Sequence, residues 1–150
     1  MFTVRLDETD VEERWYESDP TMRFKIALPF NAETGSKDSA VGYFEVEPGN
    51  ALPAHTDSAE EILLCLEGRV EITLGNERSQ ISAGDMALVP AMVPHALRNG
   101  GTETVRVVGF FSRVMVETTF EQPLMPSCQQ VFNAPSRVGR RYTSGGASAT

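Results

Sequence analysis

The chain has 150 residues, of which 41% are hydrophobic and 23% are charged, a balance typical of one globular domain with a single hydrophobic core. Its net charge of −8 argues against a nucleic-acid partner, because phosphate backbones are bound by clustered lysine and arginine. The apolar runs are too short to cross a bilayer, and the N-terminus lacks the basic and apolar regions of a secretory signal. We therefore expect a cytoplasmic protein that binds neither nucleic acid nor membrane.

The expected elements are almost entirely β-strands, because short apolar and β-branched runs alternate with turn residues. Asp10–Tyr16 is predicted to form a short turn of helix, whereas Pro29–Asp38 and Pro48–Ala54 are predicted to be loops. Gly75-Asn76 predicts a tight hairpin turn. In chain order, the expected strands cover Met22–Leu28, Ala40–Glu47, Glu61–Leu66, Arg69–Leu74, Glu77–Ile81, Met86–Val89, His95–Arg98, Thr104–Phe111 and Arg113–Phe120. This pattern predicts an all-β sandwich or barrel.

After Phe120 the composition changes towards proline, serine, glutamine and glycine. We expect residues 1–120 to form the barrel and residues 121–143 to form an arm that packs on the barrel or on a second subunit. Residues 144–150 are expected to be a disordered tail. We expect a homodimer. The N-terminal segment and the arm could exchange between two chains, and an open edge strand that is left bare would pair with another chain.

The only two histidines, His55 and His95, stand near acidic residues that could share a site with them. His55 and Asp57 are two residues apart, so on a strand both can face the interior, and Glu61 can join them after a short bend. Two imidazoles and one or two carboxylates in an apolar interior require a compensating charge. The residues therefore predict one divalent cation, and donors of this kind suit Fe(II), Mn(II), Ni(II), Cu(II) or Zn(II).

The two histidine segments also resemble the paired motifs of the cupins. Gly49, His55, Glu61 and Gly68 match the first motif, G-x5-H-x-H-x3–4-E-x6-G, in which Asp57 replaces the second histidine. Gly84, Pro90, His95 and Asn99 match the second motif, G-x5-P-x-G-x2-H-x3-N, in which Met92 replaces the middle glycine. That glycine usually serves a turn, so we expect a different backbone at Met92, and we expect Asn99 to be a turn residue.

The resemblance implies a double-stranded β-helix, the jelly-roll barrel of the cupins, with the motif core at residues 49–99. It also implies a metal site formed by His55, Asp57, Glu61 and His95. Asp57 departs from the family pattern, and two roles stay open for it. It either binds the ion as a fourth ligand or turns away from the ion and acts as a general base.

Three functions are compatible with this site. The first is a mononuclear non-haem iron dioxygenase with Fe(II) as its ion and a small organic substrate. The second is a redox-neutral isomerase, lyase or decarboxylase in which the ion is a Lewis acid. The third is a non-catalytic barrel that binds a small molecule.

Cys65 is expected to be a packing residue on the same inward face as Glu61 and Leu63.

Overall fold

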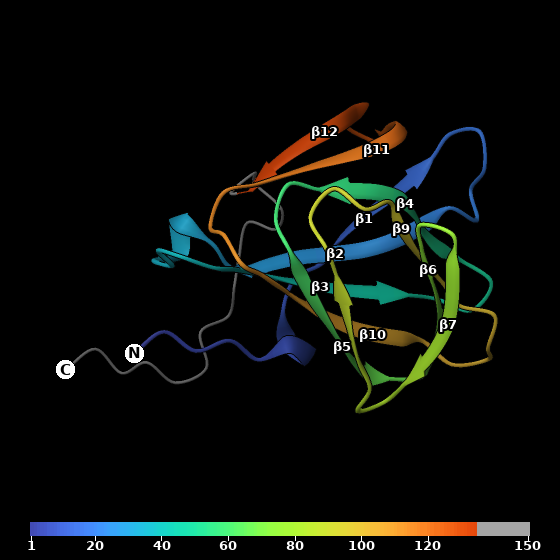
Figure 1. Cartoon of the computed structure of the whole chain (residues 1–150), viewed down its shortest axis with the longest axis horizontal. Helices are drawn as coiled ribbons and strands as arrows, with labels where there is room; N and C mark the ends of the chain where they lie inside the picture. The colour runs from blue at the N-terminus through green and yellow to red at the C-terminus, as the bar shows by residue number, and fades with distance from the viewer. Residues whose placement is uncertain (135–150) are drawn as a thin grey trace.

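The computed structural model describes residues 1–134, in which nearly all of the regular structure is β (Figure 1). Its strands are β1 (Glu12–Tyr16), β2 (Arg23–Phe30), β3 (Ala40–Val46), β4 (Ala51–Asp57), β5 (Glu61–Glu67), β6 (Arg69–Leu74), β7 (Glu77–Ser82), β8 (Met86–Val89), β9 (His95–Arg98), β10 (Val105–Phe111), β11 (Val116–Met125) and β12 (Gln129–Ala134). The helices of this part are two single turns, η1 (Leu6–Glu8) and η2 (Ala32–Thr34), and neither is long and apolar enough to cross a membrane.

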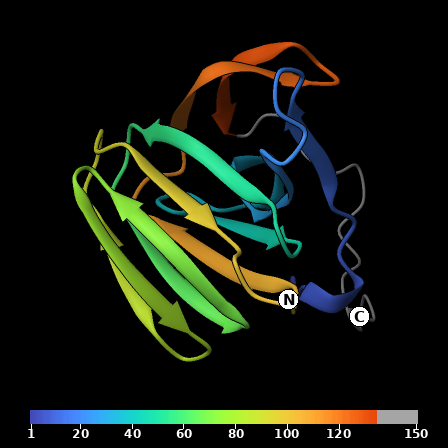
Figure 2. The same cartoon turned by 90° about the vertical axis from the view of Figure 1, so that its right-hand side faces the viewer.

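All the strands belong to one antiparallel sheet in the order β7-β6-β9-β4-β11-β1-β2-β3-β10-β5-β8, and β12 pairs with β11 outside this path. The sheet curls into a nearly closed barrel, on which β11 and β12 lie side by side (Figures 1 and 2). The expected jelly-roll barrel is therefore confirmed. Gly75-Asn76 lies between β6 and β7, which pair along their whole length as predicted.

The barrel interior is filled by alternate residues of the strands. On β5, Glu61, Leu63 and Cys65 are buried while Ile62 is exposed, as the sequence predicted. The main core contains Phe24, Phe44, Leu52, Leu63, Val70, Leu97, Val107 and Phe120, among other residues. Burying a side chain of this size stabilises the fold by about 1.5–3 kcal/mol, so this apolar filling provides the rigid frame for the inward polar residues.

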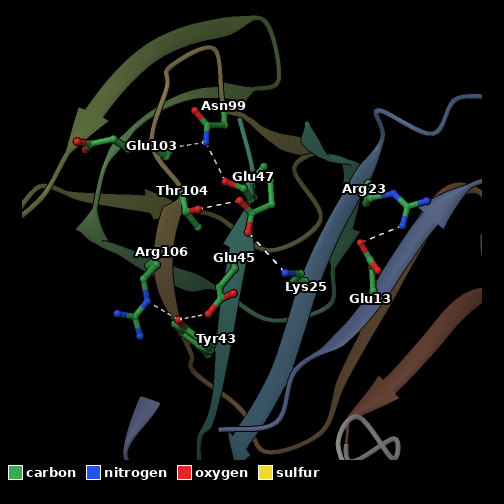
Figure 3. A network of polar contacts seen from close by, with 11 residues as sticks. Glu13, Arg23, Lys25, Tyr43, Glu45, Glu47, Asn99, Glu103, Thr104 and Arg106 are labelled. Carbon is green, nitrogen blue, oxygen red and sulfur yellow. Dashed lines mark hydrogen bonds and ion pairs between the residues drawn. The ribbon is translucent and has the colours of Figure 1, made fainter. Parts of the chain in front are cut away.

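The outer face of β3 and β10 carries a second, smaller cluster under the N-terminal segment. Tyr43 is fully buried there, and Leu6 and Val11 pack against its cluster. The Tyr43 hydroxyl donates to Glu45 and accepts from Arg106, as Figure 3 shows. Leu6 and Val11 thereby attach the N-terminal segment to the outside of the barrel, on the face opposite to the main core.

Two expectations about local structure are wrong. Asp10–Tyr16 does not form a helical turn: η1 lies earlier in the chain, and β1 occupies Glu12–Tyr16 because its backbone pairs with both β2 and β11. Pro48–Ala54 is not all loop, since β4 begins at Ala51 and pairs with β9. Pairing with neighbouring strands outweighed the local preferences of both segments.

The end of the described chain folds back along the barrel. The expected boundary after Phe120 falls inside β11, which continues to Met125 before β12 returns beside it. The Gln130 side-chain amide donates to the backbone carbonyls of Phe120 and Glu121. The later part of the expected arm and the tail at residues 144–150 lie outside the described residues.

Candidate metal centre

Adjacent strands bring the two histidines together in the barrel. His55 on β4 is the register partner of His95 on β9, and the centroids of their rings are 4.1 Å apart. Asp57 follows on the same face of β4, where it lies opposite Thr118 of β11. His55, Asp57 and His95 are 6%, 2% and 2% exposed, so their polar atoms must find partners inside the protein.

Backbone carbonyls fix the orientation of both imidazole rings. Nδ1 of His55 lies 2.8 Å from the Pro53 carbonyl oxygen, and Nδ1 of His95 lies 3.0 Å from the Val93 carbonyl oxygen. A carbonyl only accepts, so each Nδ1 carries the proton and donates it. The lone pair of a neutral ring is then on Nε2, the atom that faces the site and can bind a metal.

Asp57 completes a compact group of possible ligands. Its Oδ2 lies 3.6 Å from Nε2 of His55 and 3.2 Å from Nε2 of His95. One ligand atom from each of the three residues lies within 4.8 Å of the other two, a spacing that one ion can bridge. Thr118 donates its hydroxyl proton to Oδ1 of Asp57 and thereby leaves Oδ2 directed at the histidines.

Glu61 lies beside this group, next to His95. Its Oε1 is 3.3 Å from Nε2 of His95, and the residue is 2% exposed. The compact group itself comprises His55, Asp57 and His95, so Glu61 adjoins it through His95. The structure thus places all four predicted site residues in one buried cluster.

Two buried atoms of this cluster show that a cation fits there. Nε2 of His95 and Oδ2 of Asp57 have no hydrogen-bond partner of acceptable geometry, although they are close together. A neutral imidazole and a carboxylate would direct lone pairs at each other across this gap. Nitrogen and carboxylate oxygen donors are ligands that divalent transition metals accept, so the residues present fit such an ion.

Burial and neighbouring charges shift the pKa values of the residues in this cluster. Burial lowers the pKa of His55 to about 4, and the charge of His95 acts in the same direction. Burial also acts to lower the pKa of His95, but the nearby carboxylates of Asp57 and Glu61 outweigh it and raise the pKa to about 10. Burial raises the pKa of Glu61, and the charge of Asp57 adds to this effect. The raised pKa values of His95 and Glu61 both show that the cluster favours added positive charge, which a divalent cation would supply.

An apolar pocket opens beside the metal centre. Its cavity volume is about 60 Å³, and it opens to solvent on one side. His55, Asp57, Thr118 and Arg14 are its polar members, and the rest of its wall is Phe24, Ile26, Leu28, Phe44, Leu52, Phe111, Val116, Phe120, Leu124 and Phe132. A wall of this composition suits a small organic molecule with little charge over most of its surface.

The other residues considered from the sequence are structural. Cys65 is buried, with its thiol close to the Glu67 and Gly68 carbonyls. The Asn99 side chain donates to the Val46 and Glu103 carbonyls and closes a turn, as expected. Met92 corrects an expectation, because its φ of 64° retains the left-handed backbone that a glycine would adopt.

Three residues that the sequence analysis did not single out also shape the site. Thr118 holds Asp57, Arg14 lines the pocket, and Gly109 makes room for Glu61. A Cβ atom at Gly109 would lie 2.2 Å from Oε2 of Glu61. A glycine inside an apolar strand is a known sign of close approach by another group, and this was the available clue.

Comparison with known proteins agrees with this architecture. A family model described as a cupin domain matches residues 42–111. The quercetin 2,3-dioxygenase of Bacillus subtilis is 41% identical over 51 residues, which are 33% of this chain and 15% of that protein. An uncharacterized protein of Streptomyces coelicolor is 29% identical over 112 residues, 75% of this chain and 96% of that one.

Solved structures show the same fold. Oxalate decarboxylase of Bacillus subtilis, described with Mn(II) centres, has a TM-score of 0.59 and 23% identity, and the match covers 66% of this chain and 28% of that one. The chain spans only part of both enzymes, so the similarity concerns the barrel and not their activities. The barrel, the paired motifs and the family model that matches residues 42–111 together show that this chain contains a cupin domain.

Proposed function

We propose that the protein is a metal-dependent enzyme that acts on a small organic molecule, and that it is a mononuclear non-haem iron dioxygenase. The observation that carries this proposal is the cluster of His55, Asp57 and His95 at one wall of an apolar pocket. A redox-active ion such as Fe(II), held by histidine and carboxylate donors, supplies electron transfer and open positions for small ligands.

The protein residues would divide the remaining tasks. His55, Asp57, Glu61 and His95 hold the ion, while Thr118 and the two backbone carbonyls fix the directions of the ligand atoms. The aromatic wall excludes water and positions the substrate. The match to part of a quercetin dioxygenase supports an oxygen-dependent reaction.

Oxygen consumption tests this proposal. The protein loaded anaerobically with Fe(II) should take up O₂ when an aromatic or enolic substrate is added, and label from ¹⁸O₂ should appear at two positions of the product. His95→Ala, which removes a metal ligand, should abolish the uptake. Turnover of a substrate at the same rate without oxygen would contradict the dioxygenase proposal.

A redox-neutral isomerase, lyase or decarboxylase is the second candidate. It is supported by the likeness of the fold to oxalate decarboxylase and by Asp57, which lines the pocket and could take a substrate proton if it does not bind the ion. If this protein is a redox-neutral enzyme, its ion acts as a Lewis acid, and Mn(II), Ni(II), Cu(II) or Zn(II) could serve. Oxygen-independent turnover would favour it, and tight ligand binding without turnover would favour a non-catalytic barrel.

The homodimer expected from the sequence stays a prediction. Phe110, Ile62 and Leu88 are register partners across β10, β5 and β8, and they are 42%, 37% and 54% exposed on the outer face. β8 ends the strand order, so this apolar row lies at an edge of the sheet. A second copy of the chain would cover both the apolar row and the open edge at β8. Light scattering at micromolar concentration tests whether the protein is a dimer.

A further inference from the structure

The pocket beside the metal centre contains one charged group to which the proposed function gives no role. Arg14 on β1 is the only lysine or arginine among the lining residues in the described part of the chain. Its side chain is 12% exposed, and it shares the pocket wall with His55 and Asp57. A guanidinium in a largely apolar wall is expensive to desolvate, so its position calls for an explanation.

Arg14 is held in place from the side of its own strand. One terminal nitrogen pairs with the Glu12 carboxylate, and the other donates to the Glu13 carbonyl at 3.1 Å. Glu12 is not a lining residue of the pocket, whereas Arg14 is. A guanidinium has five N–H donors in a planar fork, and these two contacts engage it without using all five. Glu12 therefore anchors the cation, and the remaining donors are available to a ligand.

A row of aromatic rings separates Arg14 from the metal centre. The Phe120 ring stacks on His55 at 5.0 Å and on Phe24 at 5.8 Å between centroids. Phe24 is the register partner of Arg14 on β2, so these two side chains share one face of the sheet. A ligand that reached from the ion to Arg14 would have to pass the Phe120 and Phe24 rings, so its body should be apolar and aromatic rings suit it.

We infer that Arg14 is a specificity-determining residue, and that the substrate is an apolar, ring-bearing molecule with an acidic group. The acidic group meets the Arg14 guanidinium, the apolar body lies along Phe24 and Phe120, and the far end approaches the ion. This inference rests on the proposed function, because it takes the pocket beside the ion as the substrate site. The metal ligands carry two carboxylates, which balance a divalent ion, so Arg14 supplies the positive charge that an anionic substrate needs.

Binding of a matched pair of probes tests the inference without turnover. 3-Phenylpropionate and 3-phenylpropanamide have the same shape and differ in charge, and the full chain loaded with Zn(II) has no redox chemistry. By calorimetry the wild-type protein should bind the acid about tenfold more tightly than the amide, as expected for a hydrogen bond to a charged group. Arg14→Gln should reduce this preference to about twofold or less, whereas Arg98→Gln, on the exposed side of β9, should keep it.

Glu12→Gln provides an independent test, since Arg14→Gln leaves Glu12 without its cation and could disturb β1. Removing the competing carboxylate should strengthen binding of the acid and leave binding of the amide unchanged. Equal binding of acid and amide by the wild-type protein, or no binding of either, would overturn the inference. An acid preference that persists in Arg14→Gln would also overturn it, because the carboxylate would then be bound by the ion.

Failure of this inference and failure of the proposed function give different results. An acid preference that depends on Arg14, without oxygen uptake by the Fe(II)-loaded protein, would retain the substrate class and remove the dioxygenase. Oxygen uptake with neutral substrates that is unaffected by Arg14→Gln would retain the dioxygenase and remove the role of Arg14.

Discussion

The Glu61 carboxylate occupies the space in which a side chain at Gly109 would begin. An added Cβ at Gly109 would lie 2.2 Å from Oε2 and 2.9 Å from Cδ of Glu61, closer than real Cβ contacts allow. The position of a proposed metal ligand on β5 therefore depends on the absence of a side chain on β10.

Gly109→Ala should displace the Glu61 carboxylate and weaken metal binding by about 10–100-fold, the range found when groups that orient metal ligands are removed. Gly42→Ala is the matched control, because Gly42 is the register partner of Gly109 and its added Cβ would meet the Phe44 ring instead. The control should lose about 1–3 kcal/mol of stability through overpacking and keep its metal affinity. Competition with a chelator measures the affinity, and equal affinity in both variants would contradict the role of Gly109.

Asp57→Asn and Asp57→His test the two roles of Asp57. If Asp57 binds the ion, Asp57→Asn should lower the metal affinity because it removes the anionic donor, and Asp57→His should restore binding by supplying an imidazole. Metal analysis after dialysis measures both variants. Full occupancy of Asp57→Asn together with lost turnover would instead identify a general base and favour the redox-neutral enzyme.

Thr118→Val should weaken metal binding by about tenfold, because Oδ1 of Asp57 would lose its hydrogen bond and the carboxylate could rotate. Thr118→Ser keeps the hydroxyl and should retain the affinity of the wild-type protein. Both variants are close in size to threonine, so thermal unfolding can show that the barrel is intact. Equal affinities of the valine and serine variants would show that the hydrogen bond does not position Asp57.

The two cysteines should differ strongly in reactivity. Burial raises the pKa of the Cys65 thiol, so little thiolate forms at neutral pH, and the residue is inaccessible in the core. Cys128 is exposed. A disulfide reagent should modify one thiol of the native protein rapidly and a second only after unfolding, and Cys128→Ser should abolish the rapid phase. Rapid modification of native Cys128→Ser would contradict the packing of Cys65.

The residues of the candidate site could be located from the sequence, whereas some of the elements around them could not. His55, Asp57, Glu61 and His95 could be found because they occur at fixed spacings in two sequence motifs, and the structure brings all four together from β4, β5 and β9. β1 was mistaken for a helical turn because its acidic and aromatic residues have no clear alternation, and only pairing with β2 and β11 makes it a strand.

The supporting residues depend on contacts between distant segments. Thr118 meets Asp57 across β11 and β4, and Gly109 meets Glu61 across β10 and β5, so neither role has a local pattern in the chain. Arg14 could not be placed in the pocket while its segment was expected to be helical. Met92 retains a left-handed φ although it is not a glycine, which shows that the turn before His95 is imposed by its surroundings.

Metal content, measured together with thermal stability, tests most directly the claim that His55, Asp57, Glu61 and His95 hold one divalent ion. Protein purified without added metal should contain about one transition-metal ion per chain, and His95→Ala should contain almost none. An ion at about 100 times its dissociation constant stabilises the fold by about 2.7 kcal/mol, so chelation should lower the Tm of the wild-type protein by about 5–10 °C and leave that of His95→Ala unchanged. Equal metal content in the two proteins, or an unchanged wild-type Tm after verified metal removal, would contradict the account.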